Sequence, residues 1–276
     1  MLKKLQSNAI FPHHVQHQPE TPILDVSSLS VVYDSIVALD NITFRLEAGQ
    51  RMAVIGPNGA GKTTLFKVIA GVLPYSSGQV RIGGHTPGGH ICIAYLPQRS
   101  QVDWRFPVNV TDVVMMGRIG KLGLAHWPGR KDWRFIQQCL AEVGLEDLAG
   151  RQISELSGGQ QQRMFIARAL AQEAELLLMD EPFTGLDVTS QEDILRILDG
   201  LRQRGVTVLA STHDLRLASE KFEQVMLLNR RIIGFGCPAD VFTSQHLMDA
   251  FGGHLRLVQS GGETLAIGDA YCEEDR

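Results

Sequence analysis

The sequence predicts an α/β fold in which a mixed, largely parallel β-sheet is joined by an antiparallel β subdomain and an inserted helical subdomain. Three observations predict it. Residues 51–70 read as a buried strand, a glycine-rich loop and an amphipathic helix. Strands and helices alternate again from residue 175 onward. Between these segments, residues 108–172 carry helical spacing, so a helical block separates two halves of the α/β core.

The N-terminal part of the chain precedes this core. Residues 1–22 are polar, and we interpret them as a flexible extension. The extension brings three histidines together, namely His13, His14 and His17. A metal-binding tail is the alternative, but such a site needs three or four positioned ligands. Residues 29–33 and 41–46 are strand-like, which predicts an antiparallel β unit.

The glycine-rich loop fits the pattern G-x-x-x-x-G-K-[ST], which is typical of the phosphate-binding loop of nucleoside triphosphatases. Its nine residues are Gly56, Pro57, Asn58, Gly59, Ala60, Gly61, Lys62, Thr63 and Thr64. The glycines allow an anion to approach the backbone at the positive end of the helix. Lys62 is placed to reach the β- and γ-phosphates of a nucleotide, and Thr63 to ligate Mg²⁺.

The flanks of this loop decide between two interpretations. A chance glycine turn before a helix is the alternative to a phosphate site. The preceding strand at 51–55 is apolar, and the following helix carries Leu65, Phe66, Ile69 and Val72 on one face. This context favours the core of a P-loop nucleoside triphosphatase.

The remaining elements follow in order. Further strands are predicted at 78–82, 91–95, 175–180 and 206–210, and twice within 224–235 around a turn at 229–231. Helices are predicted at 109–116, 133–143 and 191–201, with a loop over 117–129. The stretch after Phe251 is weakly patterned.

The composition of the 276 residues excludes several classes of protein. The hydrophobic content of 44% and the charged content of 20% are ordinary for a globular protein. A net charge of −4 argues against broad binding to nucleic acid. No apolar run approaches the roughly 18 residues of a membrane span, and we expect no secretory signal. The four cysteines are scattered, which indicates reduced thiols rather than a disulfide framework.

Two acids end the apolar strand predicted at 175–180. A strand that delivers carboxylates beside a phosphate loop places them where a nucleotidase needs them. We expect Asp180 to hold Mg²⁺, directly or through water, and Glu181 to orient or polarise the water that attacks the γ-phosphate. Alone, the pair could equally cap the next turn, and the phosphate loop favours the catalytic interpretation.

Residues 156–160, Leu-Ser-Gly-Gly-Gln, precede a helix expected over 161–171. Ser157 is a good N-cap residue. Gly158 and Gly159 expose N–H groups at the start of the helix, which could form a second anion site. A capped helix after a flexible turn is equally consistent with these residues.

Taken together, these motifs resemble the ATP-binding subunit of an ABC transporter. The resemblance covers about residues 23–245, and residues 156–160 are highly specific to that family. It also rests on the phosphate loop, the acids after residue 179, Gln98, residues 185–187 and His213, in the family's order and spacing. It implies ATP and Mg²⁺ as cofactors and ATP hydrolysis coupled to transport across a membrane.

The resemblance implies roles for residues in the nucleotide site. Tyr33 would stack on adenine, although an aromatic residue in a strand is often simply packed. Gln98 would contact Mg²⁺ and the attacking water and would sense the membrane partner. His213 would hold the γ-phosphate and support Glu181.

The resemblance also implies that the site is shared between two subunits. Ser157 and Gly159 would contact the γ-phosphate bound to the opposite subunit, with Gly158 and Gln160 in the same signature. Asp187 would link the two sites. One phosphate loop and one signature in the chain imply a homodimer, or a pair with a similar chain, that closes around ATP and opens after hydrolysis.

A finer resemblance lies in residues 95–107 and 110–118, which are similar to ATPases of manganese, zinc and iron importers. It implies import of a divalent metal ion, manganese first and then zinc or iron. The implied partners are an integral membrane permease, a second ATPase subunit and, indirectly, an extracytoplasmic metal-binding protein. The chain would lie peripherally at the cytoplasmic face of the cell membrane. Four residues would either line the permease groove or pack in the helical block, namely Trp104, Phe106, Met115 and Met116.

Two rival functions and a division of the chain complete these predictions. The same ATPase could serve another solute, or the chain could be a soluble ABC ATPase of translation or DNA repair. Soluble ABC ATPases of that kind usually carry two ATP cassettes or long coiled coils, and this chain has neither.

We expect an extension over 1–22, an ATPase domain over 23–245 with its helical subdomain at about 99–172, and a tail over 246–276.

Overall fold

The computed structural model describes residues 21–87, 92–123 and 126–252, and the backbone of 255–260 and 263–268. Its main sheet joins six strands in the order β5, β6, β7, β3, β8, β9. Their bounds are β5 (Ile93–Leu96), β6 (Leu176–Met179), β7 (Thr207–Thr212), β3 (Arg51–Ile55), β8 (Gln224–Asn229) and β9 (Arg231–Gly236). All neighbours are parallel except β8 and β9, which confirms the mixed, largely parallel sheet.

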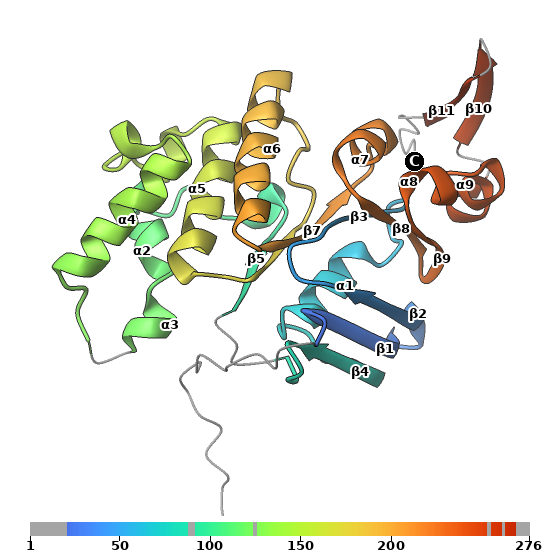
Figure 1. Cartoon of the computed structure of the whole chain (residues 1–276), viewed down its shortest axis with the longest axis horizontal. Coiled ribbons are helices and arrows are strands. Elements are labelled where there is room, and N and C mark those ends of the chain that lie inside the picture. The colour runs from blue at the N-terminus through green and yellow to red at the C-terminus, as the bar shows by residue number, and fades with distance from the viewer. Residues whose placement is uncertain (1–20, 88–91, 124–125, 253–254, 261–262, 269–276) are drawn as a thin grey trace, which may run out of the picture.

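A second, antiparallel sheet has the order β2, β1, β4. Its strands are β1 (Leu24–Tyr33), β2 (Ile36–Leu46) and β4 (Ser77–Ile82). The antiparallel β unit is therefore confirmed, and it lies beside the main sheet in Figure 1. After Phe251, where the sequence is weakly patterned, β10 (Leu255–Ser260) and β11 (Glu263–Gly268) pair as an antiparallel hairpin that the sequence did not predict. The three histidines of the predicted flexible extension over 1–22 lie outside the described residues.

The inserted helices form one block at one side of the main sheet (Figure 1). They are α2 (Val110–Met116), α3 (Ile119–Leu122), α4 (Arg130–Glu142) and α5 (Gly158–Gln172), with 3-10 turns η1 (Arg99–Gln101), η2 (Glu146–Leu148) and η3 (Ile153–Glu155). Helix α3 corrects the expected loop over 117–129. The glycines around it concealed the helical signal, and Arg118 and Lys121 hold it through ion pairs to Glu173.

The remaining helices are α1 (Lys62–Ile69), α6 (Val188–Gln203), α7 (Leu215–Lys221), α8 (Pro238–Val241) and α9 (Ser244–Phe251). Helix α1 ends before Val72, whose side chain is 67% exposed. The prediction that Val72 shares the apolar face was wrong, because Gly71 takes a left-handed φ of 70° and turns the chain away from the helix.

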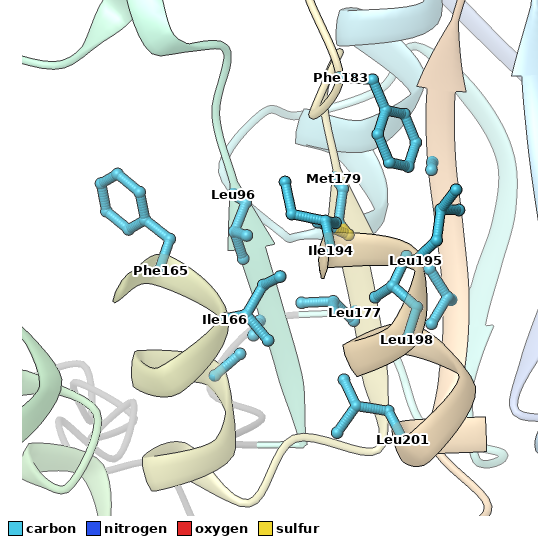
Figure 2. Packing of buried hydrophobic residues seen from close by; sticks show 14 of the residues in the cluster. Leu96, Phe165, Ile166, Leu177, Met179, Phe183, Ile194, Leu195, Leu198 and Leu201 are labelled. Carbon is cyan, nitrogen blue, oxygen red and sulfur yellow. The ribbon is translucent and has the colours of Figure 1, made fainter. Parts of the chain in front are cut away.

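The two faces of the main sheet bury two separate hydrophobic clusters. Leu177 and Met179 of β6 face α5 and α6, where Ile166, Ile194 and Leu198 pack against them (Figure 2). The alternate residues of the same strand, Leu176 and Leu178, belong to the cluster shared with α1 and the antiparallel sheet. Burial on both faces explains why these strands read as continuous apolar runs.

Candidate functional site

The phosphate loop joins β3 to α1 and depends on its glycines. Gly59 and Gly61 have φ values of 78° and 97°, in the left-handed region that favours glycine. A Cβ on Gly56 would lie 2.0 Å from the backbone oxygen of Leu228 in β8. The loop can therefore turn tightly against the sheet and end at the N-terminus of α1, where a helix favours an anion.

Lys62 lies over this loop with only 7% of its surface exposed. Its Nζ donates to the carbonyl oxygens of Gly56 at 2.6 Å and Pro57 at 3.0 Å. Burial lowers the pKa of Lys62, and the carboxylates of Glu181 and Asp180 oppose that shift. The Lys62 ammonium group is thus largely removed from water, so its attraction to a phosphate group is stronger than in bulk water, and the two nearby carboxylates leave room for a bound cation to balance their charge.

Asp180 follows β6 and is almost fully buried, with 3% of its surface exposed. Its carboxylate accepts a hydrogen bond from the Thr63 hydroxyl at 2.6 Å and another from the Ser211 hydroxyl at 2.7 Å. Three chain segments that are far apart in sequence therefore converge on one carboxylate. The oxygens of Thr63 and Asp180 are the kind of donors that Mg²⁺ prefers.

Glu181 is held by contacts to both its backbone and its side chain. Its φ of 49° is a left-handed conformation that is uncommon for a residue with a side chain. Its N–H donates to Ser211 Oγ at 2.8 Å. Its Oε2 accepts from Gln98 Nε2 at 3.1 Å and from Thr184 Oγ1 at 3.3 Å. This network fixes the direction in which the carboxylate points.

These groups surround an open cavity of about 720 Å³. Its lining residues are Ala38, residues 56–64, Gln98, Glu181, His213 and Phe251. The structure therefore brings the predicted phosphate loop, Gln98, Glu181 and His213 together around one space. Tyr33, at the end of β1, is 40% exposed and does not line the cavity, so its stacking on adenine stays a prediction.

The signature residues gather in a second cluster that does not line this cavity. Ser157 caps α5, with its hydroxyl accepting from Gln160 N at 3.3 Å and Gln160 Oε1 accepting from Ser157 N at 2.9 Å. A Cβ on Gly159 would lie 2.5 Å from Ser190 Oγ of α6. Ser190 also donates to the Asp187 carboxylate from its backbone N–H at 2.9 Å and its hydroxyl at 2.8 Å. These two hydrogen bonds lower the pKa of Asp187.

Sequence reasoning missed several residues of the site. Ser211, the fully buried residue that touches both Asp180 and Glu181, lies in an apolar strand and carries no motif. Ala38 and Phe251 reach the cavity from β2 and α9. No local signal marks Phe251, because the packing of α9 on β8 and β9 brings it there. Arg99, whose Nε donates to Gln161 Oε1 at 2.7 Å, connects the segment after Gln98 to α5.

A comparison with protein families decides the family of this chain. The model of the family described as ABC transporter matches residues 39–184, just over half of the chain. The chain belongs to the ABC transporter family. ABC transporter ATPases bind nucleotide, hydrolyse ATP and work with a membrane permease, so the chain is an ATP hydrolase that associates with a membrane protein. Among the described residues, no helix is both long and apolar enough to cross a bilayer.

Several ATP-binding subunits of metal transport systems are similar in sequence to most of this chain. The manganese transport system ATP-binding protein MntB of Halalkalibacterium halodurans is 44% identical over 246 residues, which are 89% of this chain and 98% of that protein. The zinc transport system ATP-binding protein TroB of Treponema pallidum is 45% identical over 84% of this chain and 88% of its own length. The chelated iron transport system membrane protein YfeB of Yersinia pestis is 43% identical over 88% of this chain and 84% of its length.

Solved structures confirm the fold. CbiO1 of Clostridium perfringens, part of the ABC transporter complex cbiONQ, superposes with a TM-score of 0.71 at 27% identity, covering 83% of this chain and 94% of CbiO1. An ATP-binding cassette of an ABC transporter in its ADP conformation gives a TM-score of 0.73 at 23% identity, covering 84% of this chain and 99% of its own. At that identity the second likeness concerns the fold alone.

Proposed function

We propose that this chain is the ATP-hydrolysing subunit that powers import of a divalent metal ion, manganese first and then zinc or iron, through a membrane permease. The observation that carries the ATPase assignment is that Lys62, Thr63 and the Gln98–Glu181 pair line one cavity, with the buried carboxylate of Asp180 hydrogen-bonded to Thr63. The metal assignment is supported by relatives at 43–45% identity that are named for manganese, zinc and chelated iron transport.

The residues at the cavity fit a magnesium ion bound with ATP. Asp180 is a buried carboxylate hydrogen-bonded to the Thr63 hydroxyl, and both groups offer the hard oxygen ligands that Mg²⁺ takes. We assign Thr63 and Asp180 to this ion, with Gln98 as a further ligand. When bound, the ion would neutralise charge on the β- and γ-phosphates.

The side chains around the cavity divide the remaining work. Lys62 and the phosphate-loop backbone hold the β- and γ-phosphates, and His213, which lines the same cavity, holds the γ-phosphate. Glu181 orients the attacking water and receives its proton. Gln98, Thr184 and Ser211 act as positioning residues, because each donates to, or accepts from, Glu181 itself.

A second subunit completes the site. The signature residues Ser157, Gly158, Gly159 and Gln160 do not line the cavity of their own chain, which supports their contacting nucleotide held by a partner copy. Asp187 belongs to the same cluster through Ser190. We propose a homodimer at the cytoplasmic face of the membrane, attached to the permease and served by an extracytoplasmic metal-binding protein. ATP holds the dimer closed, and loss of the γ-phosphate contacts opens it.

Metal uptake in cells lacking this chain tests the proposal, with manganese, zinc and iron followed in parallel at limiting supply. We expect uptake of one metal to be lost, restored by the parent chain and not by Glu181→Gln. In the purified protein that variant should hydrolyse ATP at least about 100-fold more slowly, the usual effect of losing a general base. It should also accumulate as an ATP-bound dimer.

Glu220→Gln is the matched control, because Glu220 lies on the exposed surface of α7 and pairs with Arg216. It should hydrolyse ATP and restore uptake as the parent does. Normal turnover by Glu181→Gln would refute the role of Glu181. Unchanged uptake of all three metals would remove the metal assignment and leave the ATPase in place for another solute.

A further inference from the structure

Helix α3 and the start of α4 lie at the end of the helical block away from the N-terminus of α5 (Figure 1). Large apolar and basic side chains are exposed on these two helices and shortly before α4. Trp127 is 93% exposed, and Trp133 and Ile119 are about half exposed. Three exposed cations lie on the first two turns of α4. We call this surface the Trp127 patch, and its residues are Ile119, Trp127, Arg130, Lys131, Trp133 and Arg134.

The two helices hold this patch together through an internal ion pair. Arg118, just before α3, pairs with Asp132 of α4 at 3.2 Å. Asp132 also accepts the backbone N–H of Gly129 at 3.0 Å. Gly129, two residues after Trp127, is therefore hydrogen-bonded to the first turn of α4, so the chain at Trp127 lies near the cations of that helix.

The patch is positively charged although the whole chain carries a net charge of −4. Within the described part of the chain, Arg130, Lys131 and Arg134 have no ion pair with a carboxylate. The acid between them, Asp132, is turned toward Arg118, and both of these side chains are largely buried. The exposed charge of this helix start is therefore not cancelled locally.

Large apolar aromatic groups beside uncompensated cations are the combination that suits an anionic lipid surface. Indole rings favour the headgroup region of a bilayer. Lysine and arginine are attracted to the negative potential of the cytoplasmic leaflet. A permease surface fits less well, because the cytoplasmic loops of membrane proteins are themselves rich in lysine and arginine.

We propose that the Trp127 patch binds the anionic lipid headgroups of the membrane beside the permease. This inference rests on the proposed function for the location of the chain at the membrane. It adds a lipid contact of the ATPase itself, separate from the nucleotide cavity and from the permease groove after Gln98. Such a contact would hold the outer end of the helical block at the bilayer surface during the ATP cycle.

The full-length chain is tested by co-sedimentation with vesicles at low salt. One set contains phosphatidylcholine and phosphatidylglycerol, and the other contains phosphatidylcholine alone. We expect binding to the anionic vesicles only. A triple variant, Arg130→Gln with Lys131→Gln and Arg134→Gln, should bind them about 100-fold more weakly, at about fivefold per cation. Trp127→Ala should weaken binding and reduce the blue shift of tryptophan emission on vesicle addition, with Trp133 giving the remainder.

Two control variants match these changes elsewhere on the surface. Arg196→Gln, Arg202→Gln and Arg216→Gln together remove the same charge from α6 and α7, where each arginine is paired with a carboxylate. Tyr75→Ala removes another partly exposed aromatic ring. Both controls should bind as the parent does, and circular dichroism with ATP-binding measurements establishes that every variant is folded.

Equal binding to neutral and anionic vesicles, absence of binding, or equal loss in the patch and control variants would each overturn the proposal. So would loss of permease association in the triple variant with vesicle binding unchanged, because the patch would then contact protein. The ATPase proposal is judged separately by hydrolysis, which patch variants should retain in solution. A failure of either idea is thus distinguishable from a failure of the other.

Discussion

Replacement of Ser211 by alanine tests whether one buried hydroxyl organises both acids of the site. Ser211 lies in β7 and is completely buried. Its hydroxyl donates to Asp180 Oδ1 at 2.7 Å and accepts from the Glu181 N–H at 2.8 Å. The substitution removes a single oxygen atom, so it changes hydrogen bonding with little change in packing.

The expected loss follows from the two partners that are left behind. The carboxylate of Asp180 loses a hydrogen bond to a charged group, which contributes about 1.5–3 kcal/mol, and the buried N–H of Glu181 loses its acceptor, at about 1–3 kcal/mol. We expect the free energy of unfolding to fall by about 3–5 kcal/mol. Hydrolysis should slow on the order of 100-fold, because displacement of reacting groups by about 1 Å has that effect.

Urea denaturation and steady-state ATP hydrolysis measure the two effects. Thr207→Val is the matched control, because Thr207 lies at the start of the same strand and its buried hydroxyl accepts from the Gly49 N–H at 3.0 Å. It should lose about 1–3 kcal/mol of stability and keep its rate of hydrolysis. The reasoning is refuted if Ser211→Ala loses no more stability than the control and hydrolyses ATP within twofold of the parent.

Glycine substitutions test the packing around the phosphate loop, and thiol reactivity tests the burial of the cysteines. Gly56→Ala should destabilise the chain by about 3 kcal/mol, because the added Cβ would meet a backbone oxygen of β8 at 2.0 Å. Gly200→Ala in α6, where no atom lies within 4 Å of the new Cβ, should stabilise it by about 1 kcal/mol, and similar melting shifts would contradict this account. In a Cys272→Ser background, exposed Cys237 should react first with Ellman's reagent at pH 8. Burial raises the pKa of Cys139 to about 12, which leaves roughly 0.01% thiolate at that pH, so equal rates at the two thiols would contradict the structure.

The nucleotide-binding half of the site was predictable from the sequence because its signals are local. The glycine spacing from Gly56 to Gly61 reflects left-handed backbone and close packing, both of which are visible in residue type alone. The apolar run before Asp180 reflects a strand buried on both faces. Ser157 and Gln160 form a capping box within four consecutive residues. Each of these features depends on neighbours in the chain, so one sequence suffices to find it.

Other parts were concealed because their causes are not local. Helix α3 lies among glycines that oppose a helix, and its ion pairs to Glu173 more than fifty residues away hold it in place. The hairpin of β10 and β11 is stabilised by pairing between strands rather than by a strong alternation of residue types. Local propensity is weak compared with such tertiary contacts.

The sequence by itself determined the fold class, the family's motifs and the chemistry that they imply. Only the tertiary structure decided which residues meet. It placed Ser211 between Asp180 and Glu181, brought Phe251 to the cavity, and held the signature residues away from the phosphate loop of their own chain. The physical reason is that a motif records the conformation and capping of a few adjacent residues. Contacts between β6, β7 and α9 arise when hydrophobic burial folds distant segments together, and no short pattern records that meeting.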